Sequence, residues 1–103
     1  MKNLIRIYEM LVKTSDEEIE LNGLRSVNYE FWIKGKKKSY EKILEAINKG
    51  LTKKQLIGEI EIRLMMSKIS LENCKVEIVT YKAYVKGLCD GYKESLTHIE
   101  NYE

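Results

Sequence analysis

Residues 27–67 read VNYEFWIKGKKKSYEKILEAINKGLTKKQLIGEIEIRLMMS, and the interpretation of the whole chain starts from this stretch. Apolar or aromatic residues alternate with polar ones from Val27 to Ile33, a period of two that is typical of a β-strand. The lysine-rich run from Gly35 to Lys38 then ends the alternation. We therefore expect a strand at its start and a basic turn directly after it.

Two helices are expected to follow the turn. Ser39 is a suitable N-cap, because its hydroxyl can accept a free backbone N–H of the first helical turn. Gly50 fits the left-handed position that often follows a helix, so this helix is predicted to stop at about Lys49. Thr52 and Gln55 match a capping box, in which each side chain satisfies a backbone amide near the other. The chain after Gly50 is therefore predicted to form a second helix.

The order strand, turn, helix, glycine turn, helix resembles that of the ribbon-helix-helix DNA-binding proteins, over about residues 27–67. In that family two strands pair across a dimer and place their outward side chains in the major groove. The resemblance implies that these side chains are Asn28, Glu30, Trp32 and Lys34. The two helices around Gly50 also resemble a helix-turn-helix, although two packed helices without nucleic acid fit the same pattern.

Both ends of the chain favour helix. Apolar residues repeat at helical spacing in Lys2–Lys13 and, from Ser70 onward, at alternating spacings of four and three. The second pattern is a heptad-like seam that indicates a long C-terminal helix, packed within the domain or against a second copy. Gly87 and Gly91 interrupt it, and each costs about 1 kcal/mol relative to alanine inside a helix. A break near these glycines is therefore expected. The seam consists of Cys74, Ile78, Tyr81, Val85, Leu88 and Tyr92.

The acidic stretch that ends near Asn22-Gly23 is compatible with a further turn of helix or with a strand. Ile19 and Leu21 alternate with glutamates there, and we favour a strand that forms a β-hairpin with residues 27–33. The predicted fold class is thus α+β and helix-rich. It has an N-terminal helix, a small β-hairpin, two helices split by a glycine turn and a long C-terminal helix, in a single compact domain over residues 1–103.

A winged helix-turn-helix is the alternative fold. Residues 59–66 and 75–85 also alternate in polarity, and as strands they would form a wing after helices at about 40–49 and 52–58. The chain would then resemble the winged-helix DNA-binding proteins. The capping box at Thr52 and the heptad-like seam favour helices over both segments.

Length and composition fit a folded, cytoplasmic protein. A chain of 103 residues with 44% hydrophobic content is enough for one domain with a core. No apolar run approaches the ~20 residues of a membrane helix. The N-terminal segment is broken by charged residues and does not match a signal peptide. We therefore expect a cytoplasmic location and no membrane partner.

Positive charge is concentrated in the middle of the chain. The net charge is +2, yet residues 25–54 hold nine Lys and Arg against three Asp and Glu, and both flanking segments are net acidic. This pattern indicates a local anionic partner. We predict a basic patch that contacts nucleic acid, with one aromatic side chain placed to stack on a base or enter a groove. Its members are Lys34, Lys36, Lys37, Lys38, Lys42, Lys49, Lys53, Lys54 and Trp32.

No catalytic or metal-binding motif is present in the sequence. Cys74 and Cys89 lie fifteen residues apart and His98 is the only histidine, which does not match the ligand spacing of a zinc site. Buried free thiols in a reducing compartment explain the cysteines better. We find no nucleophile–base pair and no paired carboxylates, so we expect no enzymatic activity, no metal and no cofactor.

Two functions are compatible with these patterns. The first is a small protein that binds double-stranded DNA through the lysine-rich turn, as a regulatory or accessory factor of a plasmid or phage and possible homodimer. A mobile-element origin is inferred from the small size and the absence of catalytic motifs. The second is a protein-interaction module, such as a phage-encoded inhibitor of a host defence system. It would bind a host protein through its helical surface or through Asp16–Glu20.

Overall fold

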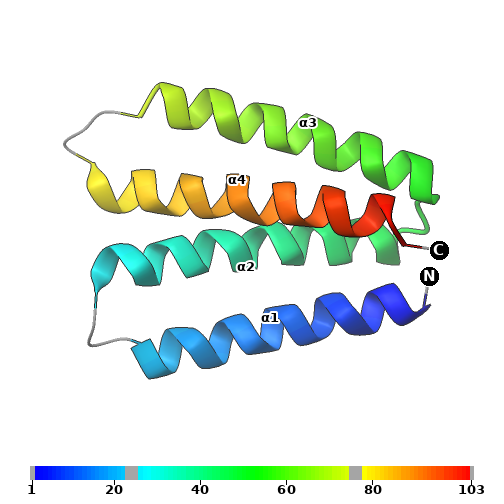
Figure 1. Ribbon diagram of the computed structural model, residues 1–103, viewed down its shortest axis with the longest axis horizontal. Helices are drawn as coiled ribbons and strands as arrows, with labels where there is room; N and C mark the ends of the chain where they lie inside the picture. The colour runs from blue at the N-terminus through cyan, green and yellow to red at the C-terminus, as the bar shows by residue number, and fades with distance from the viewer. Residues whose placement is uncertain (1, 23–25, 75–77, 103) are drawn as a thin grey trace.

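The computed structural model describes residues 2–22, 26–74 and 78–102, and these residues form four α-helices with no β-strand. The helices lie side by side in a bundle of 40 × 30 × 21 Å (Figure 1). The prediction of an α+β fold with a β-hairpin is therefore wrong, and so is the winged helix-turn-helix alternative. The elements are α1 (Lys2–Asn22), α2 (Val27–Asn48), α3 (Lys53–Glu72) and α4 (Val79–Glu100).

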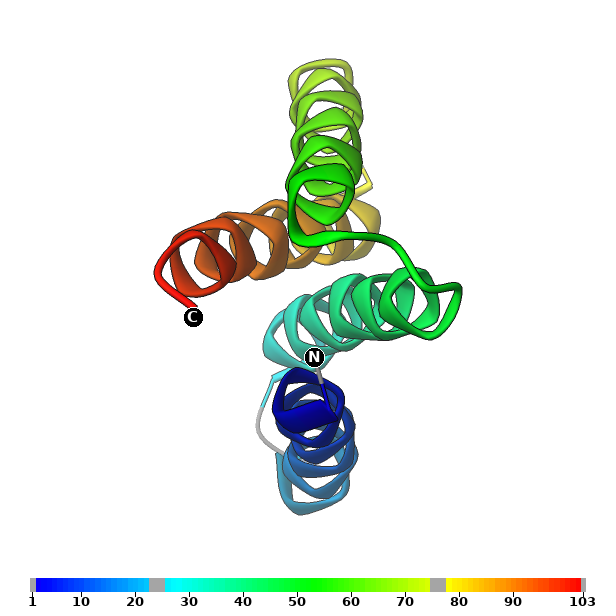
Figure 2. The same cartoon turned by 90° about the vertical axis from the view of Figure 1, so that its right-hand side faces the viewer.

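The bundle is layered. α2 and α4 form a central pair, α1 packs on the outside of α2, and α3 packs on the outside of α4 (Figure 2). After α2 the chain therefore enters the outer helix α3 before α4 returns through the centre. Each outer helix packs mainly on one neighbour, so a broad part of its surface faces solvent.

The segment predicted as a strand forms the first turns of α2. Ser26, not Ser39, is the N-cap, and its hydroxyl accepts the backbone N–H of Tyr29 at 3.3 Å. Ser39 is buried inside the helix, where its hydroxyl donates to the carbonyl oxygen of Lys36 at 2.6 Å. The alternation between Val27 and Ile33 is misleading, because Val27 is 60% exposed and Ile33 only 2%. From Ile33 onward the buried residues follow a helical period instead: Gly35, Ser39, Tyr40, Ile43, Ala46 and Ile47.

The acidic stretch predicted as the first strand of the hairpin belongs to α1, which continues past Lys13 to Asn22. Ser15 is buried in this helix, and its hydroxyl donates to the carbonyl oxygen of Leu11 at 2.8 Å. Asp16, the next residue, forms an ion pair with Lys37 of α2. Contacts with α2 thus favour helix over this stretch. The predicted turn at Asn22-Gly23 falls partly outside the described residues.

The predicted helix boundary around Gly50 is confirmed. α2 ends at Asn48 with Lys49 as its C-cap, and Gly50 adopts a positive φ of 85°, which glycine reaches without steric strain. Thr52 and Gln55 form the predicted capping box: the Gln55 backbone N–H donates to Thr52 Oγ1 at 3.2 Å, and the Thr52 N–H donates to Gln55 Oε1 at 3.0 Å.

The boundary between the last two helices lies further along the chain than predicted, because the long C-terminal helix is expected to start at Ser70. α3 continues to Glu72 and α4 begins at Val79, so residues 59–66 of the proposed wing lie in α3 and residues 79–85 in α4. Residues 75–77 lie outside the described part of the chain. Cys74 and Ile78 precede α4, and Ile78 is 50% exposed. The seam that packs in the core therefore begins only at Val85.

α4 runs without interruption through Gly87 and Gly91, so the predicted break is wrong. Both glycines face α2, opposite Gly35 and Ser39. A Cβ atom on Gly87 would lie 2.0 Å from the carbonyl oxygen of Trp32, and one on Gly35 would be equally close to a carbonyl oxygen of α4. The two backbones are therefore in direct contact, and this packing offsets the low helix propensity of glycine.

The apolar core lies between the layers. Its buried residues come from all four helices, and Leu4, Leu56 and Ile99 have no exposed surface. Within the described ranges, none of the helices combines the length and the apolar character that crossing a membrane requires. The buried core cluster comprises Leu4, Tyr8, Tyr40, Ile43, Ala46, Ile47, Leu56, Ile60, Leu64, Cys89, Tyr92 and Ile99.

Alanine substitution of two glycines tests the contact between α2 and α4. Gly87→Ala should lower the free energy of unfolding by about 1–3 kcal/mol, because the added methyl group forces the two backbones apart. Gly58→Ala is the control: this glycine lies inside α3, and its Cβ would meet nothing within 4 Å. It should leave stability unchanged or raise it by up to ~1 kcal/mol. Urea unfolding in dilute solution measures both, and equal effects would contradict the close contact.

Candidate functional site

The predicted basic turn does not form. Its lysines lie inside α2, where successive residues are rotated by about 100° around the helix axis. Lys34 and Lys38, four residues apart, therefore share one face of the helix, whereas Lys36 and Lys37 point to other sides. Of the other predicted members, Lys42 and Lys49 also lie on α2 or its C-cap, and Lys53 and Lys54 open α3.

Trp32 and Lys36 contact α4. Trp32 donates its indole N–H to Asp90 Oδ2 at 2.8 Å. The Lys36 ammonium lies 3.1 Å from Glu94 Oε1 and 4.7 Å from the centre of the Trp32 ring. Tyr40 donates its hydroxyl to the other oxygen of Glu94 at 2.8 Å. These five side chains on α2 and α4 link the central pair, which gives Trp32 and Lys36 a structural role.

Lys37 and Lys53 also have partners on other elements. Lys37 pairs with Asp16 of α1, and this hydrogen bond raises the pKa of the lysine. Lys53 donates to the carbonyl oxygens of Glu100 and Tyr102 at 3.3 and 2.6 Å, where a cation is favoured by the C-terminal end of the α4 dipole. Both lysines therefore hold an outer helix to its neighbour or to the chain end.

The remaining ion pairs of the predicted patch are looser. Lys42 and Lys49 lie 3.8 and 3.4 Å from the carboxylate of Glu45, and the two ammonium groups lower the pKa of that carboxyl. Lys34 lies 3.8 Å from Glu30. Solvent-exposed pairs of this kind contribute little to stability. Such lysines can exchange a glutamate for a stronger anionic partner.

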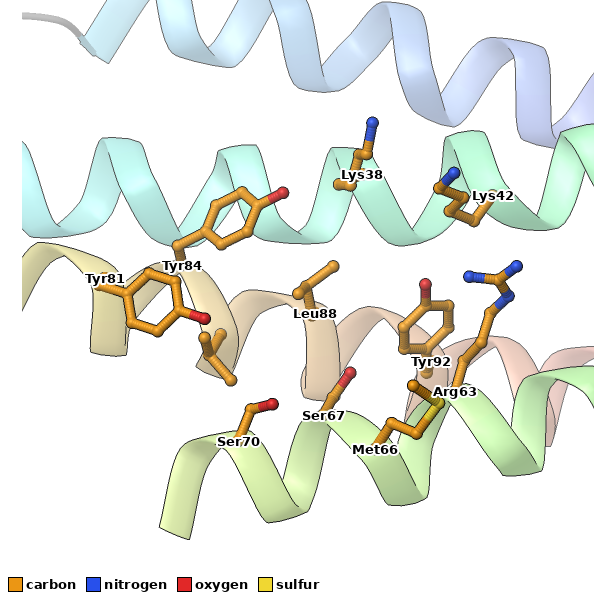
Figure 3. Close-up of a pocket in the computed structure, with 11 residues that line it drawn as sticks. Lys38, Lys42, Arg63, Met66, Ser67, Ser70, Tyr81, Tyr84, Leu88 and Tyr92 are labelled. Carbon is orange, nitrogen blue, oxygen red and sulfur yellow. The ribbon is translucent and has the colours of Figure 1, made fainter. Parts of the chain in front are cut away.

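A groove of about 300 Å³ lies between α2 and α3, with α4 as its floor (Figure 3). It exists because α2 and α3 touch little along their lengths, while both pack on α4. Tyr81, Tyr84, Leu88 and Tyr92 form most of the floor. Ser67 and Ser70 of α3 add hydroxyl groups to one side.

Three cationic side chains lie along the rims of this groove. Lys38 and Lys42 come from α2, and Arg63 comes from α3 on the opposite rim. Arg63 donates through Nε to Glu59 at 2.9 Å, and Figure 3 shows its terminal nitrogens turned toward the hydroxyl of Tyr92. None of the described residues that line the groove is acidic. The groove therefore combines an aromatic floor with a positively charged rim.

Two tyrosines of the floor, Tyr84 and Tyr92, are neutral at physiological pH. Burial raises the pKa of Tyr84 and of Tyr92, and for Tyr92 the nearby Arg63 guanidinium acts in the opposite direction. Neutral hydroxyls can donate or accept a hydrogen bond. With cations beside them, they suit a carboxylate or another anionic group better than a basic one.

The sequence prediction thus identified two residues of this groove, Lys38 and Lys42, and missed Arg63 and Tyr84. A signal for the floor is present in the sequence, because Tyr81, Tyr84, Leu88 and Tyr92 are spaced three or four apart and share one face of a helix. Three of them belong to the predicted core seam. The spacing of the seam residues does not show that part of this face of α4 stays uncovered between α2 and α3.

The cysteines and the histidine form no chemical site in the described part of the chain. Cys74 and Cys89 are free thiols, and burial raises the pKa of Cys89, which makes it a poor nucleophile. His98 is exposed on α4, with its ring centre 6.3 Å from that of Tyr8. Among the described residues no group of three His, Cys, Asp or Glu side chains could hold a metal ion.

Comparison of the chain with models of protein families, with curated proteins and with solved structures finds no match. The geometry and charge of the groove are therefore the basis for the function proposed below.

Stability at high pH tests the buried tyrosines. Burial raises the pKa of Tyr8, and burial together with the hydrogen bond to Glu94 raises that of Tyr40. Since these folded-state values exceed the unfolded value of about 10, the unfolded chain loses protons first as the pH rises. The free energy of unfolding should therefore fall above about pH 10. Tyr40→Phe should make this fall shallower in urea unfolding between pH 7 and 11, and a curve parallel to the wild type would contradict the assignment.

Proposed function

We propose that this protein is a non-enzymatic interaction module whose groove between α2 and α3 binds an acidic, elongated segment of another protein. The observation that carries the proposal is the combination of an aromatic floor with cationic rims on both sides of one groove. It corresponds to the protein-interaction alternative of the sequence analysis, with the groove in place of Asp16–Glu20 as the contact surface.

The shape of the groove favours an elongated ligand. Its floor extends along α4 from Tyr81 to Tyr92, a distance of about 16 Å at 1.5 Å per residue. That length matches about three turns of a helix, so the groove suits the binding mode in which a helix lies with its apolar face in a cleft. Tyrosine is well suited to such a floor, because its ring offers apolar area and its hydroxyl a hydrogen bond.

The charge of the rims selects the partner. Lys38 and Lys42 on one side and Arg63 on the other can pair with carboxylates on both flanks of a bound helix, and arginine can bind a carboxylate through two parallel hydrogen bonds. Complementary charge also raises the rate of association and disfavours basic partners. An acidic amphipathic segment can pack its apolar face on the aromatic floor and pair its carboxylates with the cationic rims.

Double-stranded DNA is the second candidate. The net positive charge of residues 25–54 and the three cations around one groove favour it. Much of the predicted patch, however, is engaged within the protein, with Trp32 bound to Asp90 and Lys36 to Glu94. A narrow concave groove also suits a single helix better than the convex surface of a duplex. We therefore place DNA second.

Charge reversal in the groove separates the two candidates. A photo-reactive phenylalanine analogue at Leu88 should cross-link to an acidic segment of a partner protein, and the peptide identified in this way is then titrated against purified protein. The double variant K38E/K42E should weaken this binding by at least about tenfold, through loss of attraction and added repulsion. The matched control is K82E/K86E, which makes the same charge change at exposed positions of α4 outside the groove. It should bind the peptide like the wild type.

A gel shift with duplex DNA completes the test. The proposal predicts no shift at physiological salt, and binding that weakens steeply with salt would favour DNA instead. Equal loss of peptide binding in both charge-reversal variants would show that net charge, rather than the groove, attracts the partner. A cross-linked peptide without acidic residues would also contradict the proposal.

A further inference from the structure

The outward face of α3 is apolar. Ile62, Met65 and Ile69 are 57, 64 and 51% exposed. Their spacing of three and four places them in one stripe along the helix, on the side opposite to the buried residues that face α4. An outer helix of a bundle normally carries polar residues on this side. Intrachain packing does not account for this stripe.

A hollow adjoins the stripe at Gly58. The glycine lies inside α3, and a Cβ there would meet nothing within 4 Å. A surface depression above it is lined by Lys53, Lys54, Ile57 and Glu61. Glycine lowers helix stability by about 1 kcal/mol relative to alanine, and here it neither adopts a positive φ nor allows a close contact within the chain. The absence of a side chain at this position leaves room for an external group.

We propose that α3 pairs with α3 of a second copy of this chain, in antiparallel orientation about a two-fold axis. In this register Ile62 of each copy packs against Met65 of the other, and Ile69 of each copy fills the hollow above Gly58 of the other. This one arrangement buries the stripe of both copies and fills the hollow of each, as a symmetric interface requires. This interface goes beyond the proposed function and does not depend on it.

The charges beside the stripe identify the occupant as a second copy. Glu61 and Lys68 are both exposed and flank the stripe on the same side, seven residues apart. In the proposed register Glu61 of one copy faces Lys68 of the other, and the symmetry repeats this pair. At each end of the same flank, Lys54 of one copy faces Glu72 of the other, and their charges are also opposite. In a parallel, in-register pair, each of these side chains would instead lie at the same height as the identical residue of the other copy.

Charge exchange at the flank tests the interface. Sedimentation equilibrium should show a concentration-dependent dimer for the wild type. Glu61→Lys and Lys68→Glu should each raise the dimer dissociation constant by about tenfold or more, because each replaces two attractive pairs with two repulsive ones. The double variant E61K/K68E should restore dimer formation, because the pairs re-form with exchanged signs. Glu17→Lys on the exposed surface of α1 is the control and should leave the dissociation constant unchanged.

A second variant tests the hollow. Gly58→Leu fills it in both copies and should produce a monomer whose circular dichroism spectrum remains helical. Leucine favours helix, and no atom of the described residues lies within 4 Å of the new Cβ. A wild type that stays monomeric up to millimolar concentration would overturn the proposal. So would a dimer that is insensitive to both single charge changes, or a double variant that does not recover dimer formation.

Discussion

The contact between the backbones of α2 and α4 is the constraint on which the rest of the bundle depends. Gly35 and Gly87 each face a carbonyl oxygen of the opposite helix, and a side chain at either position would occupy the same space as that oxygen. Because the two helices approach so closely, residues 58 positions apart in the sequence meet, as Trp32 and Asp90 do. The polar network around Glu94 then fixes how the two helices lie along each other.

The two surfaces with proposed partners follow from the layered arrangement around this central pair. α3 packs on α4 and touches α2 little, so a groove remains between α2 and α3 with α4 below it. No other helix of the described residues packs on the opposite side of α3, which leaves its apolar stripe and the hollow at Gly58 exposed. A more compact arrangement, with every helix in contact with two others, would bury the floor of the groove.

The distribution of charge has a similar origin. Residues 25–54 carry a marked excess of lysine and arginine. Two of these lysines pair with acids on other helices, and Lys34, Lys42 and Lys49 pair with glutamates of α2 itself. Lys37 meets Asp16 of α1 and Lys36 meets Glu94 of α4, so the acidic flanks of the sequence neutralise part of its basic middle in space. Lys38 and Lys42 remain at the groove, where Arg63 of α3 joins them. The sequence predicts these two lysines, but their separation from the rest of the patch depends on the packing of helices.

Local interactions are what the sequence determined by itself. The end of α2 at Gly50 and the capping box of Thr52 and Gln55 could be predicted, because a cap involves only residues within about four positions of each other. The strand predicted from Val27 to Ile33 is wrong, because alternation cannot show which side chains another element will bury. Only the tertiary structure decided the roles of Gly35 and Gly87, since a glycine that breaks an isolated helix becomes necessary where a second backbone lies against it. The groove likewise depends on how three helices pack together, so its shape could not be predicted from the sequence of any one of them.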